Sequence, residues 1–247
     1  MLIDRTKCTG CGKCVPYCPV EAIQWHKRDK KKGVAKPYAE IDTEECVECS
    51  VCYKAKVCPT EAITDEALEW PRILRRAFSD PFCEHKGTNV PGRGTEEMKT
   101  NEVTGRFRDG TIGVGLEFGR PGIGVRLGET EKAIKRFVAM GIPLEPLNPL
   151  TQLIEDPATG ALKKDVLNEK VLSAIVEFIA PVERAQEIFA AVHEIAKEVN
   201  TVFSLDLISK AAPGGSLPVA LEAKKAGIRL SVNGKVNVGL GRPLFQG

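Results

Sequence analysis

The sequence predicts an α+β protein with two folded parts. The first is a small cysteine-rich N-terminal domain, and the second is a larger domain in which helices cover an antiparallel sheet. Eight of the nine cysteines lie within the first 58 residues. Between residues 111 and 208, segments with alternating apolar residues follow segments with helical apolar spacing. We therefore expect a domain at residues 1–66, a linker helix and loop at 67–110, and a second domain at 111–247.

The cysteines form two similar runs, each closed by a Cys-Pro pair. The runs read C-x2-C-x2-C-x3-C-P and C-x2-C-x2-C-x5-C-P. Three thiolates at this spacing can surround one corner of a [4Fe-4S] cube, whereas the fourth cysteine ligates the other cluster in the two-cluster pattern. We therefore assign cluster 1 to Cys8, Cys11, Cys14 and Cys58, and cluster 2 to Cys46, Cys49, Cys52 and Cys18.

Other uses of cysteine fit this pattern less well. Zinc sites take four ligands in two pairs, whereas here eight cysteines form two runs of four. Disulfides need an oxidising compartment, and the N-terminus does not look like a signal peptide. We therefore expect the protein in a reducing cytoplasm, in an organism that lives largely without oxygen.

An internal repeat accompanies the cysteines. Ile3-Asp4 precedes Cys8 as Ile41-Asp42 precedes Cys46, and the triplet Glu-Ala-Ile follows both Cys-Pro pairs. The first 65 residues resemble the bacterial two-[4Fe-4S] ferredoxin family. This resemblance implies one-electron transfer at low potential. The chain departs from the family pattern by two extra residues before Cys58 and by a longer connection between the two halves.

A basic segment lies between the two half-repeats. Alternation at Ile23 and Trp25, and again at Tyr38 and Glu40, predicts a hairpin whose tip carries this segment. The tip could dock an acidic redox partner, or it could be a solvated loop without a specific role. The basic residues concerned are Lys27, Arg28, Lys30, Lys31 and Lys32.

The linker region contains a short helix and a polar loop. Pro71 fits a first helical turn, and the apolar residues from Ile73 to Phe78 share one face that could dock the first domain onto the second. Residues 85–95 are rich in glycine and polar groups, which indicates an exposed connector or an anion-binding loop. The neighbouring Cys83 and His85 could form a two-ligand metal site, but a lone cysteine is usually a small buried hydrophobe.

The second domain has the pattern of a ferredoxin-like split βαβ fold. We predict strands at 111–118 and 123–127, a helix at 129–141, a hairpin tip at 156–160, a strand at 173–179, a helix at 182–200 and a strand at 201–208. A helix at 217–226 and a C-terminal hairpin at 228–240 follow, with Asn233-Gly234 at the turn. Glycines at 122, 124 and 128 do not form a dinucleotide fingerprint, since they lie within predicted strands.

A second resemblance suggests a reaction. The runs at 87–101 and 119–124 are similar to iron–sulfur reductases of the 6-hydroxynicotinate reductase type. That resemblance implies reduction of an electron-poor ring with electrons from ferredoxin. In this reading Arg93, Arg106 and Arg120 would hold a substrate carboxylate, and His85 could donate a proton.

Two alternatives to an enzyme remain open at this stage: an electron-transfer subunit whose second domain docks to a catalytic partner, and a redox sensor. A flavin would convert one-electron to two-electron chemistry, but the sequence shows no flavin fingerprint. The net charge of +2 gives no reason to expect nucleic acid as a partner. The sequence has no apolar run long enough for a membrane span, and it leaves the oligomeric state open.

Overall fold

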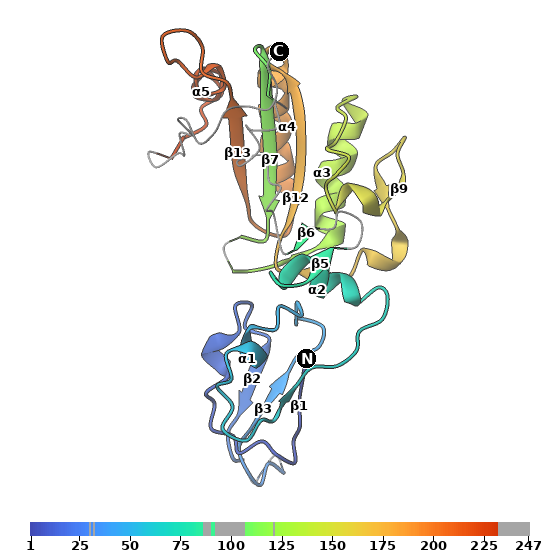
Figure 1. Ribbon diagram of the computed structural model, residues 1–247, viewed down its shortest axis with the longest axis vertical. Helices are drawn as coiled ribbons and strands as arrows, with labels where there is room; N and C mark the ends of the chain where they lie inside the picture. Colours follow the sequence, from blue (N-terminus) through green and yellow to red (C-terminus); the bar gives the residue numbers. More distant parts are fainter. Residues whose placement is uncertain (30, 32, 86–89, 92–106, 121, 232–247) are drawn as a thin grey trace.

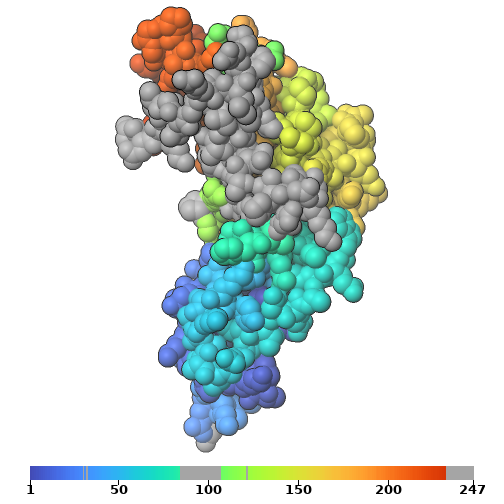
Figure 2. All heavy atoms as spheres, in the orientation of Figure 1, coloured from blue at the N-terminus to red at the C-terminus, as the bar shows by residue number. Residues whose placement is uncertain are grey.

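A computed structural model describes residues 1–29, 31, 33–85, 90–91, 107–120 and 122–231 (Figure 1). Among these residues, the buried apolar side chains form two separate cores. The smaller core lies within residues 1–63 and the larger one within residues 74–223. Figures 1 and 2 show two lobes that meet around helix α2 (Ile73–Ser79).

The N-terminal lobe consists of two halves whose strands exchange partners. Its elements are β1 (Leu2–Ile3), the 3-10 helix η1 (Val15–Tyr17), β2 (Ile23–His26), β3 (Tyr38–Ile41), α1 (Val51–Lys54) and β4 (Ile63–Thr64). Strand β2 pairs with β3, and β1 pairs with β4, so that the first strand of the lobe meets the last. The predicted hairpin is confirmed, because Asp29 and Val34 bridge its tip beyond β2 and β3.

The larger lobe is built on a three-stranded antiparallel sheet. The strand order is β12 (Ala174–Pro181), β7 (Thr111–Phe118) and β13 (Phe203–Ser209). Helices α3 (Leu127–Ala139) and α4 (Ala185–Glu198) cover one face, and α5 (Pro218–Lys225) packs against α4 and β13. Every second residue of β7 points into this core, from Ile112 to Phe118, and all four side chains are fully buried.

The remaining elements are short. Three two-stranded ribbons pair β5 (Glu84–His85) with β6 (Val90–Pro91), β8 (Val125–Arg126) with β11 (Lys170–Val171), and β9 (Ile154–Asp156) with β10 (Ala161–Leu162). Short 3-10 helices occur at η4 (Thr151–Leu153), η5 (Lys164–Val166) and η6 (Val182–Arg184). The β9–β10 ribbon confirms the hairpin predicted around residues 156–160.

Two strand predictions need correction. Of the strand predicted at 123–127, only Val125–Arg126 forms, and it pairs with β11 outside the main sheet. The reason is that Gly119, Gly122 and Gly124 have φ values of 86°, 60° and 77°, which turn the chain instead of extending it. Residues 228–231 form no strand. The rest of the predicted C-terminal hairpin lies outside the described residues.

Helix α2 belongs to the larger lobe. Leu74 and Phe78 are buried in the larger core, whereas Ile73 is 37% exposed. The side chain of Ser79 accepts a hydrogen bond from the backbone N–H of Leu172, at 2.9 Å. The helix predicted in the linker is therefore packed as part of the larger lobe, and its Arg75 and Arg76 side chains contact the N-terminal lobe at Cys46 and Asp65.

Candidate iron–sulfur site

The first group of cysteines lines a cavity in the N-terminal lobe. Its lining includes Cys8, Cys11, Cys14 and Cys58, with apolar side chains such as Ile63 between them. Cys11 is exposed and Cys14 is buried. Burial raises the pKa of the Cys14 thiol, and the neighbouring Cys11, Cys8 and Cys58 raise it further. The structure thus brings together the four cysteines that the sequence assigned to cluster 1.

The second group lies closer to the larger lobe. Cys46, Cys49 and Cys52 are each 9% exposed, and Cys18 is partly buried. Burial raises the pKa of Cys52 to about 12, helped by the neighbouring charges of Cys49, Cys46 and Cys18. These are the four cysteines that the sequence assigned to cluster 2. Iron would have to displace the thiol protons, since metal ligation requires the thiolate.

The two cysteine loops share an unusual backbone. In the first loop Gly10 and Gly12 have φ values of 69° and 72°. At the matching positions of the second loop, Glu48 and Ser50 have φ values of 56° and 60°. A left-handed backbone at both places turns the chain so that three cysteines can face one point, and glycine adopts it without strain.

Backbone amides point at the sulfur atoms at equivalent places in both halves. The N–H of Ala22 lies 3.1 Å from the sulfur of Cys18, and that of Ala62 lies 3.2 Å from the sulfur of Cys58. Hydrogen bonds to cluster sulfurs are one of the features that set the potential of an iron–sulfur centre. The repeat seen in the sequence therefore extends to the contacts of the fourth cysteine in each run.

Glu48 is a site residue that sequence reasoning missed. Its side chain is fully buried and accepts a hydrogen bond from the N-terminal ammonium of Met1, at 2.6 Å. It also accepts two hydrogen bonds from the guanidinium of Arg72, at 2.7 and 3.1 Å. The signal was present in the repeat, which aligns Glu48 with Gly10 and so marks a residue that needs support in a left-handed position.

Arg75 is the second missed residue. It is 2% exposed and donates hydrogen bonds to the backbone carbonyl oxygens of Thr43, Glu44 and Cys46, at 2.9 to 3.0 Å. Its Nε also donates to Glu169 of the larger lobe, at 2.5 Å. The guanidinium therefore joins the chain that leads into Cys46 to the larger lobe.

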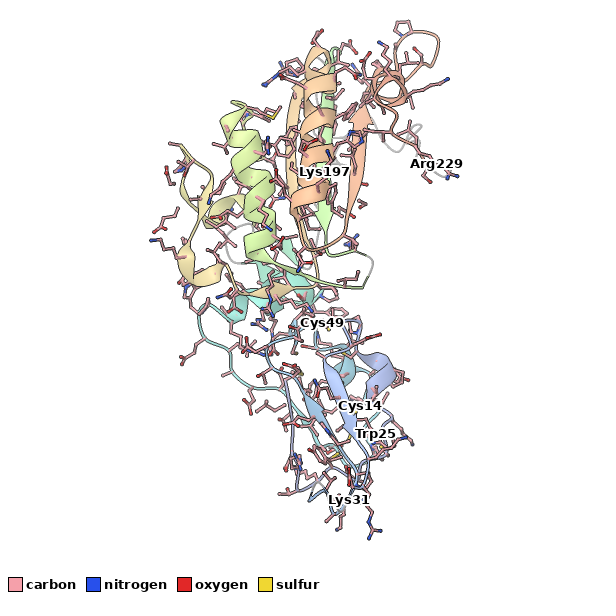
Figure 3. The ribbon with its side chains drawn as sticks, turned by 180° about the vertical axis from the view of Figure 1, so that it is seen from behind. Cys14, Trp25, Lys31, Cys49, Lys197 and Arg229 are labelled. Atoms are coloured by element: carbon pink, nitrogen blue, oxygen red, sulfur yellow. The ribbon has the colours of Figure 1, made fainter. Side chains whose placement is uncertain are left out.

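Further ion pairs cross the same boundary. Glu45 contacts Arg126 at 2.8 Å and Lys170 at 2.5 Å, and the hydrogen bond from Lys170 lowers the pKa of the Glu45 carboxyl. Lys54 of α1 contacts both carboxylate oxygens of Asp80 at 2.6 Å. The larger lobe thus contacts the chain both before Cys49, at Glu45, and after it, at Lys54, and Figure 3 shows Cys49 close to the larger lobe.

The predicted substrate residues do not form one described site. Arg120 donates a hydrogen bond to Glu117 at 3.3 Å, and only the backbone of His85 is described, in β5. Arg93 and Arg106 lie outside the described residues. Burial raises the pKa of the Cys83 thiol, and the nearby Asp80 raises it further.

The basic tip is at the far end of the N-terminal lobe. Lys27, Arg28 and Lys31 are exposed there, and Figure 3 shows Lys31 well away from the larger lobe. Lys30 and Lys32 lie outside the described residues. Within the described part of the chain, no three His, Cys, Asp or Glu side chains converge as the ligands of a single metal ion, and no helix is long and apolar enough to cross a membrane.

Comparison with known proteins identifies the class of this lobe. Residues 7–62 match the 4Fe-4S dicluster domain family. The chain is 40% identical over 63 residues to an uncharacterized ferredoxin of Methanocaldococcus jannaschii, which covers 26% of this chain and 73% of that protein. The chain therefore belongs to the 4Fe-4S dicluster family and carries an electron-transfer domain of ferredoxin type.

Other relatives extend this picture. Ferredoxin-1 of Rhodobacter capsulatus is 37% identical over 68 residues, which covers 28% of this chain and 91% of that protein. NADH-quinone oxidoreductase subunit I 2 of Symbiobacterium thermophilum is 38% identical over 131 residues, which covers 47% of this chain and 53% of that protein. No solved structure matches this chain.

Proposed function

We propose that this chain is the electron-transfer subunit of a ferredoxin-linked reductase. Its two [4Fe-4S] clusters are held by the two groups of four cysteines. They relay single electrons between a redox partner protein, which docks near cluster 1, and the side of the N-terminal lobe that faces the larger lobe. The observation that carries this proposal is the unequal surroundings of the groups. Cys11 of the first is exposed, whereas Cys46, Cys49 and Cys52 of the second are buried beside the lobe contact.

The redox partner would be a protein with an acidic surface. Cluster 1 lies on the same side as the basic hairpin tip, where Lys27, Arg28 and Lys31 are exposed. Complementary charge steers redox proteins into contact and fixes their orientation. One relative is named as a subunit of NADH-quinone oxidoreductase, which fits a chain that works with other subunits. Because low-potential clusters with thiolate ligands need a reducing compartment, we place this activity in the cytoplasm.

The larger lobe would serve as the docking module in this scheme. Strands β12 and β13 both run antiparallel to the central β7, with α4 between them in sequence, and on this basis we assign the lobe to the split βαβ type. The alternative to a docking role is a ring reductase of the 6-hydroxynicotinate type with a substrate site in this lobe. It has less support, because Arg120 is engaged with Glu117.

Cofactor analysis of anaerobically purified protein tests the proposal. We expect about eight iron and eight sulfide per chain, and four or fewer iron would refute it. Cys11→Ser and Cys49→Ser should each disrupt one cluster and lose about four iron. Cys83→Ser is the matched control, since Cys83 belongs to neither run, and it should keep the full iron content. Release of a flavin on acid extraction would contradict the docking role and favour the catalytic alternative.

A further inference from the structure

The two clusters have different neighbours at equivalent points of the repeat. In the second half, the turn at residues 43–46 enters the cluster 2 loop, and Arg75 holds three of its carbonyl oxygens. In the first half, the matching turn at residues 5–8 is exposed at Arg5, Thr6 and Lys7. Among the residues that the structure describes, a charged side chain from outside the N-terminal lobe therefore bonds to the turn of the second half and not to the matching turn of the first half.

The Arg75 side chain that makes these contacts is also buried and forms an ion pair with Glu169. Arg75 is 2% exposed and lies in α2, whose apolar residues belong to the larger core. Glu169, its ionic partner, is 9% exposed and follows the 3-10 helix η5. A planar guanidinium with several fixed donors suits this geometry, because it can hold three carbonyls and one carboxylate at once. A lysine has no such fork and could not keep all four contacts.

We infer that Arg75 is a positioning residue for cluster 2, and that the Arg75–Glu169 pair makes the properties of this cluster depend on the larger lobe. This inference rests on the proposed function, since it requires clusters at both groups of cysteines. The guanidinium fixes the carbonyl of Cys46, the first ligand of cluster 2, and brings a positive charge toward it. An iron–sulfur cluster becomes more negative on reduction, so nearby positive charge favours the reduced form.

Two single variants distinguish this role from a merely structural one. Arg75→Met removes the positive charge and should shift the reduction potential of cluster 2 to a lower value. Glu169→Gln removes the negative charge on the far side of Arg75 and should shift the same potential to a higher value. Cluster 1 should keep its potential in both variants, because it lies in the opposite part of the lobe. The shifts are measured by anaerobic redox titration with electron paramagnetic resonance of the reduced clusters.

Further variants keep the test decisive. The Cys11→Ser variant assigns the two signals, since it changes only cluster 1. If a single variant fails to fold, Arg75→Met combined with Glu169→Leu removes both buried charges together and should leave a smaller downward shift of cluster 2. Arg75→Lys keeps the charge and should preserve the potential but release iron from cluster 2 faster than the wild type does.

The outcomes separate the two claims. Opposite shifts of cluster 2 in the two single variants, with cluster 1 unchanged, support the inference. Shifts in the same direction, equal shifts of both clusters, or no shift in protein that holds all its iron would overturn it and leave the proposed function standing. A wild-type protein without two clusters would refute the proposed function itself.

Discussion

Replacing Gly10 with alanine tests the conformation of the cluster 1 loop. Gly10 has a φ of 69°, and a β carbon built there would lie 2.3 Å from the carbonyl oxygen of Pro37 and 2.4 Å from its carbon. An alanine in the left-handed region costs about 1 kcal/mol or somewhat more. Relieving an overlap with fixed backbone atoms costs roughly 1–3 kcal/mol in addition. We therefore expect Gly10→Ala to destabilise the loop by about 2–4 kcal/mol.

Gly12 provides a matched control in the same loop. Its φ is 72°, yet a β carbon there would meet only the ring of Trp25, with the nearest atom at 3.7 Å. Such a distance is an ordinary van der Waals contact. Gly12→Ala should therefore cost only the backbone term, about 1 kcal/mol. The difference between the two variants isolates the close approach to Pro37.

The rate of cluster loss is the measurement that fits this comparison. Bound cofactors break two-state unfolding, so an equilibrium free energy is not well defined for the holoprotein. Visible absorbance under anaerobic denaturant follows the loss directly. With about 1.4 kcal/mol per factor of ten, Gly12→Ala should lose cluster 1 about fivefold faster and Gly10→Ala about thirtyfold faster or more. Equal rates in the two variants would refute the loop geometry.

Three other predictions concern the lobes and their surfaces. The hydrogen bond from Lys170 lowers the pKa of Glu45, so this contact stabilises the protein above the ordinary Glu value of 4.5 and is lost as the pH falls through the lowered pKa. The protection of the amides at residues 43–46 against hydrogen exchange should therefore fall once the pH drops below 4.5, and unchanged protection would contradict the assignment. Lys31→Glu should slow electron exchange with an acidic partner by about tenfold at low salt and little at high salt, whereas Lys197→Glu on the other lobe should not. Phe137→Ala removes a buried ring whose loss costs roughly 3–5 kcal/mol, so it should clearly lower the urea concentration at which the larger lobe unfolds. An unchanged midpoint would contradict the packing of this ring, 4.6 Å from that of Phe178.

The sequence predicted most of the regular elements because their signals are local. Alternation identified β7, and helical spacing identified α3 and α4 to within a few residues at each end. The hairpin of β2 and β3 also followed from alternation on both sides of a polar tip. The dicluster domain was predictable because its eight cysteines carry their spacing in the chain itself.

The structural features that the sequence did not predict depend on contacts between distant segments. The strand expected at 123–127 was lost because the glycines before Val125 take left-handed conformations, which alternation cannot reveal. Arg75 and Glu169 are 94 residues apart, and nothing in either local sequence indicates that they meet. A buried arginine in a short amphipathic helix looks like a surface residue until its partners are known.

The non-glycine residues in the cluster 2 loop have a physical explanation in the same contacts. In the first loop, the left-handed positions are glycines. In the second, Glu48 and Ser50 occupy them, at a cost of about 1–2 kcal/mol each for a residue with a β carbon. Glu48 is hydrogen-bonded to two cations, and Ser50 lies within hydrogen-bonding reach of Asp80. Hydrogen bonds to charged groups contribute roughly 1.5–3 kcal/mol, enough to offset that cost. The loop can therefore replace glycine where the side chains gain partners from Arg72 and Asp80, which flank the two ends of α2, and this ties the departure in the repeat to the contact with the larger lobe.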